Sequence, residues 1–192
     1  MWPASQAVDV MSTQKNVQQE AGTVESSPAL RLDQEKTEQL VDALNTDLAA
    51  TYVLYHQLKK HHWNVEGAEF LPVHEFLGDA AHEAEEAADE LAERVQALGG
   101  VPIAGMKNLQ ETAPVTMEDE DVYDIRTSLA NDLEMYGDII ESYREHIELA
   151  EGLGDYATGQ MLREQIEDVE EHAHVIDHYL EDDTLVTEAA TN

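Results

Sequence analysis

The stretch "HHWNVEGAEFLPVHEFLGDAAHEAEEAADELAERVQALGG", residues 61–100, decides the fold because it joins the end of one helix to the whole of the next. Asn64 and Gly67 end the first helix, and Pro72 is tolerated in the first turn of the second, which starts near residue 70. The second helix stops at Gly99 and Gly100. Between these limits apolar residues recur at helical spacing: Leu77, Ala81, Ala84, Ala88, Leu91, Val95 and Leu98.

The rest of the chain predicts three more long helices. Asp33 is a plausible N-cap for the first helix, in which Leu40, Leu44, Leu48 and Leu58 share one face. Residues 101–117 form a long crossover with a short helix around residues 107–111. The last two helices cover about residues 120–151 and, after the "GLGD" break at residues 152–155, the chain to about residue 180.

Four helices with a single long crossover between the second and third are typical of an all-α, ferritin-like four-helix bundle. We place this bundle at residues 33–180. Residues 1–32 lack a sustained period and are expected to form a flexible tail, and residues 181–192 an acidic one.

The amino-acid composition excludes several classes of protein and of metal site. The chain has 192 residues, of which 42% are hydrophobic, enough for one domain with a substantial core. No apolar run approaches the roughly 18 residues of a membrane span, and the N-terminus lacks the features of a signal peptide, so we expect a cytoplasmic protein. The absence of cysteine excludes disulfides, thiolate metal sites and thiol nucleophiles. A metal would be held by His, Asp and Glu, which favours iron, manganese or zinc.

The charge is extreme: 42 acidic residues stand against 10 basic ones, a net charge of −32. Binding DNA through its phosphates requires clustered basic residues, and here they are scattered apart from Lys59 and Lys60, so we expect no direct DNA binding. The acidity is compatible with a surface that stays soluble in high salt, and also with a field that concentrates cations.

Four potential metal ligands occupy the two ends of the second helix. His62 ends the first helix, and the short link that follows should bring it close to His74. Asp89 and Glu93 are four residues apart and share a helix face, but Asp89 lies about 22 Å from His74 along the axis. Antiparallel pairing of two such helices across a two-fold axis would join each histidine pair to the partner's carboxylates. The ligand order therefore predicts a site made between chains.

The pattern in residues 61–100 resembles the signature of the Dps family, the ferritin-like DNA-protection-during-starvation proteins. The resemblance covers residues 33–180, and the acidity is most similar to that of the halophilic archaeal members called DpsA. It implies a hollow homododecamer that stores iron and oxidises Fe²⁺, preferably with hydrogen peroxide, at sites between two-fold-related subunits. DNA would then be protected from oxidative stress indirectly, by removal of Fe²⁺ and peroxide.

Residue by residue, the resemblance implies that His62 and His74 from one chain and Asp89 and Glu93 from its neighbour form the catalytic, iron-binding site, flanked by Trp63. The family often has another aspartate four residues after the second histidine. Here that position is Gly78, and Asp79 is turned about 100° away. This departure leaves open whether one or two irons bind.

Further candidates lie outside this site. The turn between the last two helices resembles the stretch that lines three-fold pores in the family, and its candidates for an iron pore are Glu151, Asp155, Arg163 and Glu164. Candidates for nucleating mineral on the inner wall are Glu85, Glu86 and Glu90. His174 and His178, at i and i+4, have a spacing that can hold a metal. For each of these sets, a solvated surface role is the alternative.

Two other functions are alternatives to this one. An intrachain di-metal site, as in larger ferritins and manganese catalases, needs an E-x-x-H motif on each of two helices and a glutamate on the other two. Glu171 and His174 supply one such motif, and Asp79 with His82 only comes near a second. A nucleoid-binding protein would be expected to carry a lysine-rich N-terminal tail, which this chain lacks.

Overall fold

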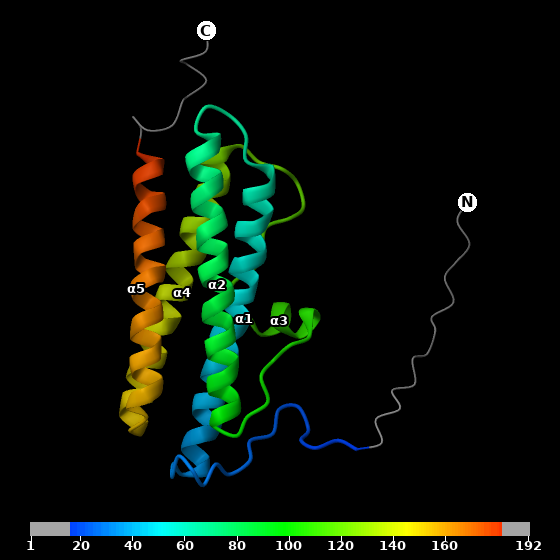
Figure 1. Cartoon of the computed structure of the whole chain (residues 1–192), viewed down its shortest axis with the longest axis vertical. Coiled ribbons are helices and arrows are strands. Elements are labelled where there is room, and N and C mark those ends of the chain that lie inside the picture. Colours follow the sequence, from blue (N-terminus) through cyan, green and yellow to red (C-terminus); the bar gives the residue numbers. More distant parts are fainter. Residues whose placement is uncertain (1–15, 182–192) are drawn as a thin grey trace, which may run out of the picture.

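A computed structural model describes residues 16–181. Its elements are α1 (Gln34–Asn64), α2 (Phe70–Ala97), α3 (Met106–Thr112), α4 (Ile125–Leu153) and α5 (Tyr156–Leu180). The four long helices run side by side as a bundle, and the short α3 lies beside α1 on the long connection (Figure 1). The ferritin-like bundle with its helix-bearing crossover is thereby confirmed. No helix within residues 16–181 combines the length and apolar character needed to cross a bilayer.

Local chemistry explains the boundaries of α4 and α5. The carboxylate of Asp124 caps α4 by accepting a hydrogen bond from the backbone N–H of Thr127, and α4 ends at Gly154, whose φ of 84° is left-handed. Asp155 then caps α5 through the N–H of Thr158. The sequence placed the start of this third long helix near residue 120, which is wrong by about one turn. Glu118 and Asp119 instead accept hydrogen bonds from Lys60 of α1, and the helix starts only after Asp124.

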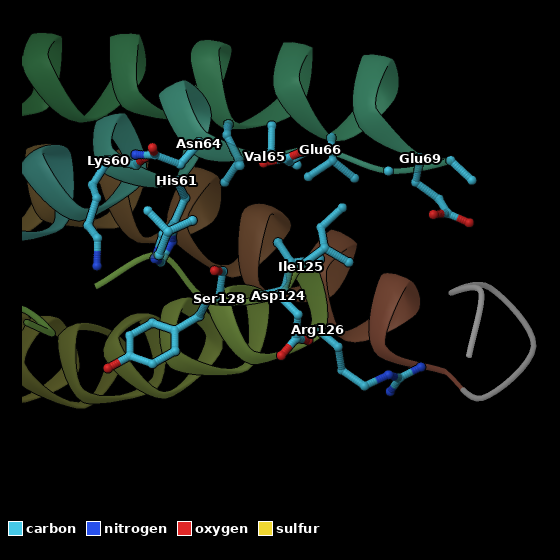
Figure 2. Close-up of a pocket in the computed structure, with 17 residues that line it drawn as sticks. Lys60, His61, Asn64, Val65, Glu66, Glu69, Asp124, Ile125, Arg126 and Ser128 are labelled. Atoms are coloured by element: carbon cyan, nitrogen blue, oxygen red, sulfur yellow. The ribbon is translucent and has the colours of Figure 1, made fainter. Parts of the chain in front are cut away.

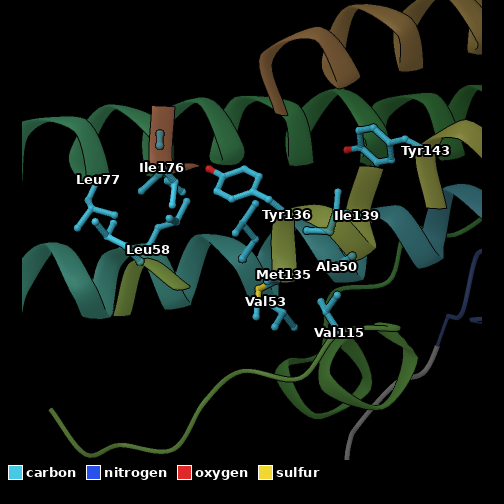
Figure 3. Close-up of a cluster of buried hydrophobic side chains, with 14 of the residues drawn as sticks. Ala50, Val53, Leu58, Leu77, Val115, Met135, Tyr136, Ile139, Tyr143 and Ile176 are labelled. Carbon is cyan, nitrogen blue, oxygen red and sulfur yellow. The ribbon is translucent and has the colours of Figure 1, made fainter. Parts of the chain in front are cut away.

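The apolar core has two parts that lie along the bundle axis. One contains Leu58, Leu77 and the tyrosines Tyr136 and Tyr143 (Figure 3). The other is built mainly from leucine and valine residues of the opposite half of α1 and α2: Leu40, Val41, Leu44, Leu48, Leu91, Val95 and Leu98. Burying such side chains is the dominant favourable term in folding.

A polar layer separates the two parts of the core. The fully buried carboxylate of Asp47 accepts hydrogen bonds from Ser142 Oγ, 2.9 Å away, and from His146 Nδ1, 2.8 Å away. Burial raises the pKa of Asp47. Burial alone would lower the pKa of His146, but the adjacent Asp47 carboxylate outweighs it and raises that pKa. The hydrogen bond between Asp47 and His146 ties α1 to α4.

The same layer continues across the bundle through Tyr143. Its hydroxyl lies 3.2 Å from Thr51 Oγ1 and donates to Gln165 Oε1, also at 3.2 Å. Gln165 Nε2 in turn donates to Glu90 Oε2 at 3.0 Å. Three hydrogen bonds thus connect α1, α4, α5 and α2. Tyr136 contrasts with this, because its buried hydroxyl has no hydrogen-bond partner among the described residues.

The segment before α1 packs against the end of α2. The backbone N–H of Glu25 and the Nε2 of Gln19 both donate to the carbonyl of Gly99 at 2.8 Å, and Val24 and Leu32 pack against the core. The sequence predicts a flexible tail for residues 1–32. The contacts described here are made by residues within the part of that segment that the structure describes, residues 16–32. Residues 1–15 and the C-terminal residues 182–192 lie outside the described residues.

Candidate metal centre

The histidine half-site forms where the α1–α2 link brings the two helices together. The imidazole rings of His62 and His74 stack with 3.8 Å between their centroids and 20° between their planes. His62 Nδ1 lies 2.7 Å from the carbonyl oxygen of His74, and His74 Nδ1 lies 2.8 Å from the carbonyl oxygen of His62. The two side chains therefore hold each other in place by a reciprocal pair of hydrogen bonds.

This pairing determines which ring nitrogens are open to a metal. A backbone carbonyl only accepts hydrogen bonds, so the Nδ1 atom of each ring must carry the proton. In the neutral form the lone pair of both rings is then on Nε2, the nitrogen left for a ligand. Hydrogen bonding of the second nitrogen is the usual way in which proteins orient histidine ligands. His62 and His74 thus form a pair of preoriented nitrogen donors.

Exposed apolar side chains lie near the histidine pair in the sequence. Trp63, next to His62, is 68% exposed, and Leu71 is 59% exposed. Phe70 is 42% exposed, and its ring lies 5.0 Å from that of His74. Large exposed apolar side chains are typical of a surface that another protein covers.

The carboxylate half-site lies toward the other end of α2. Asp89 and Glu93 are exposed and one turn apart on that helix. Within the described residues, neither carboxylate forms a side-chain hydrogen bond or ion pair. Fifteen residues separate Asp89 from His74 on one continuous helix, a distance of about 22 Å. The structure thus brings His62 together with His74 and keeps both apart from Asp89 and Glu93.

Neither half-site is a complete metal site within one chain. Across residues 16–181, no three His, Asp or Glu side chains gather closely enough to hold an ion. Each half-site offers two donors, nitrogen at one end of α2 and oxygen at the other. Hard carboxylate oxygens and imidazole nitrogens together form a ligand set suited to iron.

His61 forms a network beside this site that the sequence did not indicate. Its Nδ1 lies 2.8 Å from Asp132 Oδ2 and its Nε2 lies 2.7 Å from Glu118 Oε1. Both partners are carboxyl groups, and a ring that donates from both nitrogens, the protonated form, satisfies both of them. Lys60 and Asn131 also donate to Glu118. His61 is therefore fully engaged, although it adjoins the metal candidate His62.

The pKa values in this network follow from burial and charge. Burial would lower the pKa of His61, but the hydrogen bonds and charges of Asp132 and Glu118 raise it overall. Burial would raise the pKa of Glu118, but hydrogen bonds from Lys60, His61 and Asn131 outweigh it, so that pKa is lowered. The network anchors the crossover to α1 and α4.

The network borders a pocket of about 890 Å³ at the α1–α2 link, and Figure 2 shows Lys60 and His61 reaching from α1 toward α4 along its wall. Neither His62 nor His74 lines this pocket. The pocket is therefore separate from the histidine half-site, although both lie at the same end of the bundle.

The four pore candidates at the α4–α5 turn are already bonded to neighbours. Arg94 donates to both carboxylate oxygens of the buried Asp155 at 2.7 Å. Burial would raise the pKa of Asp155, but hydrogen bonds from Thr158 and Arg94 outweigh it and lower that pKa. Arg163 forms an ion pair with Glu151, and Gln160 donates to Glu164 at 2.8 Å. Asp155 thus has a structural role in capping α5, whereas Glu151 and Glu164 are exposed.

The other candidates lie on the surface of α2 and α5. Glu85 and Glu86 are exposed, with Glu86 3.6 Å from His82, and Glu90 accepts the hydrogen bond from Gln165. The Nε2 atoms of His174 and His178 lie 3.1 Å apart. Glu171 and His174 do not join a group of three metal-binding side chains within the described residues.

Comparison with known proteins agrees with the four-helix bundle. A family model of the ferritin-like domain matches residues 41–186. The DNA protection during starvation protein of Halobacterium salinarum is 69% identical over 180 residues, which cover 94% of this chain and 99% of that protein. The chain belongs to the Dps family.

Solved Dps structures share this fold. The crystal structure of an archaeal Dps homologue from Halobacterium salinarum matches with a TM-score of 0.87 at 69% identity, over 93% of this chain and 99% of its own. A Dps protein from Vibrio cholerae, described as a member of a broad superfamily of ferritin-like diiron-carboxylate proteins, matches with a TM-score of 0.77 at 25% identity, over 83% and 99%. The resemblance seen in residues 61–100 is thereby confirmed.

Proposed function

We propose that this Dps protein is a ferroxidase and iron store, in which each oxidation site is built from two chains. His62 and His74 of one chain bind Fe²⁺ together with Asp89 and Glu93 of a two-fold-related chain. The observation that carries the proposal is the separation of complementary donors to opposite ends of the rigid helix α2. An isologous pair of antiparallel α2 helices completes two such sites at once.

The donor types suit the chemistry. Imidazole and carboxylate bind Fe²⁺, and the hard carboxylate oxygens favour the Fe³⁺ product. Hydrogen peroxide accepts one electron from each of two Fe²⁺ ions, its O–O bond breaks, and two protons complete two molecules of water. Removing both reagents in this way limits hydroxyl-radical formation, so DNA is protected without being bound.

The exposed apolar side chains close to the histidines in the sequence support a contact with a second chain. Trp63, Phe70 and Leu71 would be covered by the partner, which excludes water from the site and delivers the two carboxylates. A pocket of about 330 Å³ beside Trp63, lined mainly by apolar side chains including Met106 of α3, extends this surface. The crossover helix would then belong to the same contact.

Storage requires a closed shell, and we propose the hollow dodecamer of the Dps family. In that cage Glu85, Glu86 and Glu90 of α2 would face the inside, where carboxylates nucleate the ferric mineral. Glu151, Glu164 and Arg163 would line an iron pore, with Asp155 maintaining the shape of the turn. His174 and His178 would offer a further capture site.

Mixing two inactive variants tests the inter-chain site directly. Each of His62→Ala and Asp89→Ala should form cages that oxidise Fe²⁺ slowly with peroxide. Cages reassembled from an equal mixture contain mixed dimers in which one of the two sites is intact, so about a quarter of wild-type activity should return. Glu148→Gln, with an exposed carboxylate on α4, is the control and should remain near wild type.

Two results would contradict the proposal. Mixed cages no more active than the separate variants would show that the four ligands do not meet between chains. Wild-type rates in both single variants would show that these residues are not the site. Loss of oxidation in Glu171→Ala together with normal rates in Asp89→Ala would instead support an intrachain di-metal enzyme.

A further inference from the structure

Gly78 lies directly beneath the ring of His62. It is one turn after His74 on α2, and a Cβ atom built on Gly78 would lie 3.0 Å from Cε1 and 3.1 Å from Nδ1 of the His62 ring. Contacts this short require the neighbouring atoms to give way by a few tenths of an ångström. His62 therefore occupies space that any other residue at position 78 would claim.

The ring cannot yield without loss of its orientation. Nδ1, one of the atoms that the added Cβ would press on, is also the donor of the 2.7 Å hydrogen bond to the carbonyl of His74. On its other side the His62 ring stacks on His74 at 3.8 Å. If the His62 ring moved away from position 78, either its hydrogen bond or its stacking on His74 would be strained. The close approach of the His62 ring to α2 therefore depends on the absence of a side chain at Gly78.

We propose that Gly78 is a positioning residue which, by having no side chain, seats His62 against His74. The inference rests on the proposed function and names the residue that sets the donor geometry of its histidine half-site.

Gly78→Ala separates this role from a general effect on folding. Alanine at a helix interior favours the helix, so the melting temperature of the cage should stay constant or rise. Its affinity for Co²⁺, which binds like Fe²⁺ but is not oxidised under these conditions, should fall about 10- to 100-fold as the orientation of His62 is lost. Opposite changes in stability and affinity are not expected of a residue with only a structural role.

Gly137→Ala provides a matched control. Gly137 also lies inside a long helix, α4, but a Cβ atom there would meet nothing within 4 Å. This variant should gain helix stability and keep wild-type Co²⁺ affinity. A double-mutant cycle then asks whether Gly78 acts through His62: in the His62→Ala background, Gly78→Ala should cause no further loss of affinity.

The measurements are calorimetric titration of the intact cage with Co²⁺ and the visible absorption of the bound ion, which reports its ligands. Tight Co²⁺ binding in the wild type and a weakened, spectrally altered site in Gly78→Ala support the inference. A wild-type affinity and spectrum in Gly78→Ala would overturn it. Reduced affinity in Gly78→Ala with unchanged affinity in Asp89→Ala would support the role of Gly78 and contradict the inter-chain site.

Discussion

His61 donates a hydrogen bond from Nδ1 to Asp132, 2.8 Å away, and Asp132 has no exposed surface. The bond connects the end of α1 to α4 over 71 residues of sequence. A buried carboxylate is costly unless it is paired, so the folded state favours the protonated form of His61. The pair His146 and Asp47 repeats this arrangement farther along the same two helices.

The first prediction is that stability falls as the pH rises above neutrality. The pKa values of His61 and His146 are raised in the folded state above the ordinary value of 6.5, so both bind a proton more tightly when folded. Their contribution is fully present below about pH 6.5 and is lost as the pH rises through the folded pKa values. The melting temperature at constant salt should therefore decrease on the alkaline side of this value.

Two variants identify the groups responsible for this pH dependence. His146→Gln should flatten it, because it removes one of the two titrating groups. His82→Gln should leave it unchanged, because the His82 side chain is 70% exposed. A melting temperature that stays constant or rises above pH 6.5 would show that the buried histidines are not charged in the folded protein.

The second prediction compares two buried tyrosines. Tyr143→Phe removes the hydroxyl that donates to Gln165 and meets Thr51, and should lower the free energy of unfolding by about 1–3 kcal/mol. Tyr136→Phe removes a buried hydroxyl that has no partner among the described residues, so it should be neutral or stabilising. Urea unfolding of both variants measures the difference, and equal losses would contradict the hydrogen-bond layer around Tyr143.

The third prediction concerns Gly99, which has a φ of 91° and contacts the N-terminal segment. A Cβ atom there would lie only 2.0 Å from the carbonyl oxygen of Glu25. Gly99→Ala should therefore cost about 1–3 kcal/mol and detach residues 16–32, which limited proteolysis would detect as faster cleavage. Gly152→Ala is the control, since its Cβ would meet nothing within 4 Å. Unchanged cleavage in Gly99→Ala would show that the segment is not held there.

The fourth prediction is that the protein does not bind DNA directly at moderate salt. The net charge of −32 repels phosphate, and Lys60, from the only adjacent pair of basic residues, is buried and bonded to Glu118. A gel-shift series at about 0.15 M salt and below should show no retardation by the assembled cage. A shift that weakens as salt is raised would contradict this and support a nucleoid-binding role.

The helices and their order could be predicted because they depend on local signals. Apolar spacing, the Gly67 and Gly99 stops and the short α1–α2 link specify the bundle and place His62 near His74. The start of α4 could not be predicted in this way. It depends on Glu118, which lies against α1 because Lys60 and His61 bind its carboxylate. These two residues are 57–58 positions away in the sequence.

The same limit applies to the site. The positions of His62, His74, Asp89 and Glu93 on two helices follow from residue spacing, since the helical rise and turn are constant. Residue spacing does not predict that the adjacent residues His61 and His62 have different surroundings in the folded protein. One is locked between Asp132 and Glu118, and the other stacks on His74 above Gly78.

The sequence by itself determined the helices, their order and the end of α2 at which each donor lies, because a helix repeats the same geometry at every residue. Only the tertiary structure decided which nitrogen of each histidine is open, which carboxylates are buried and paired, and why position 78 has no side chain. These features depend on contacts of a few ångströms between residues far apart in the chain, and packing alone sets those distances.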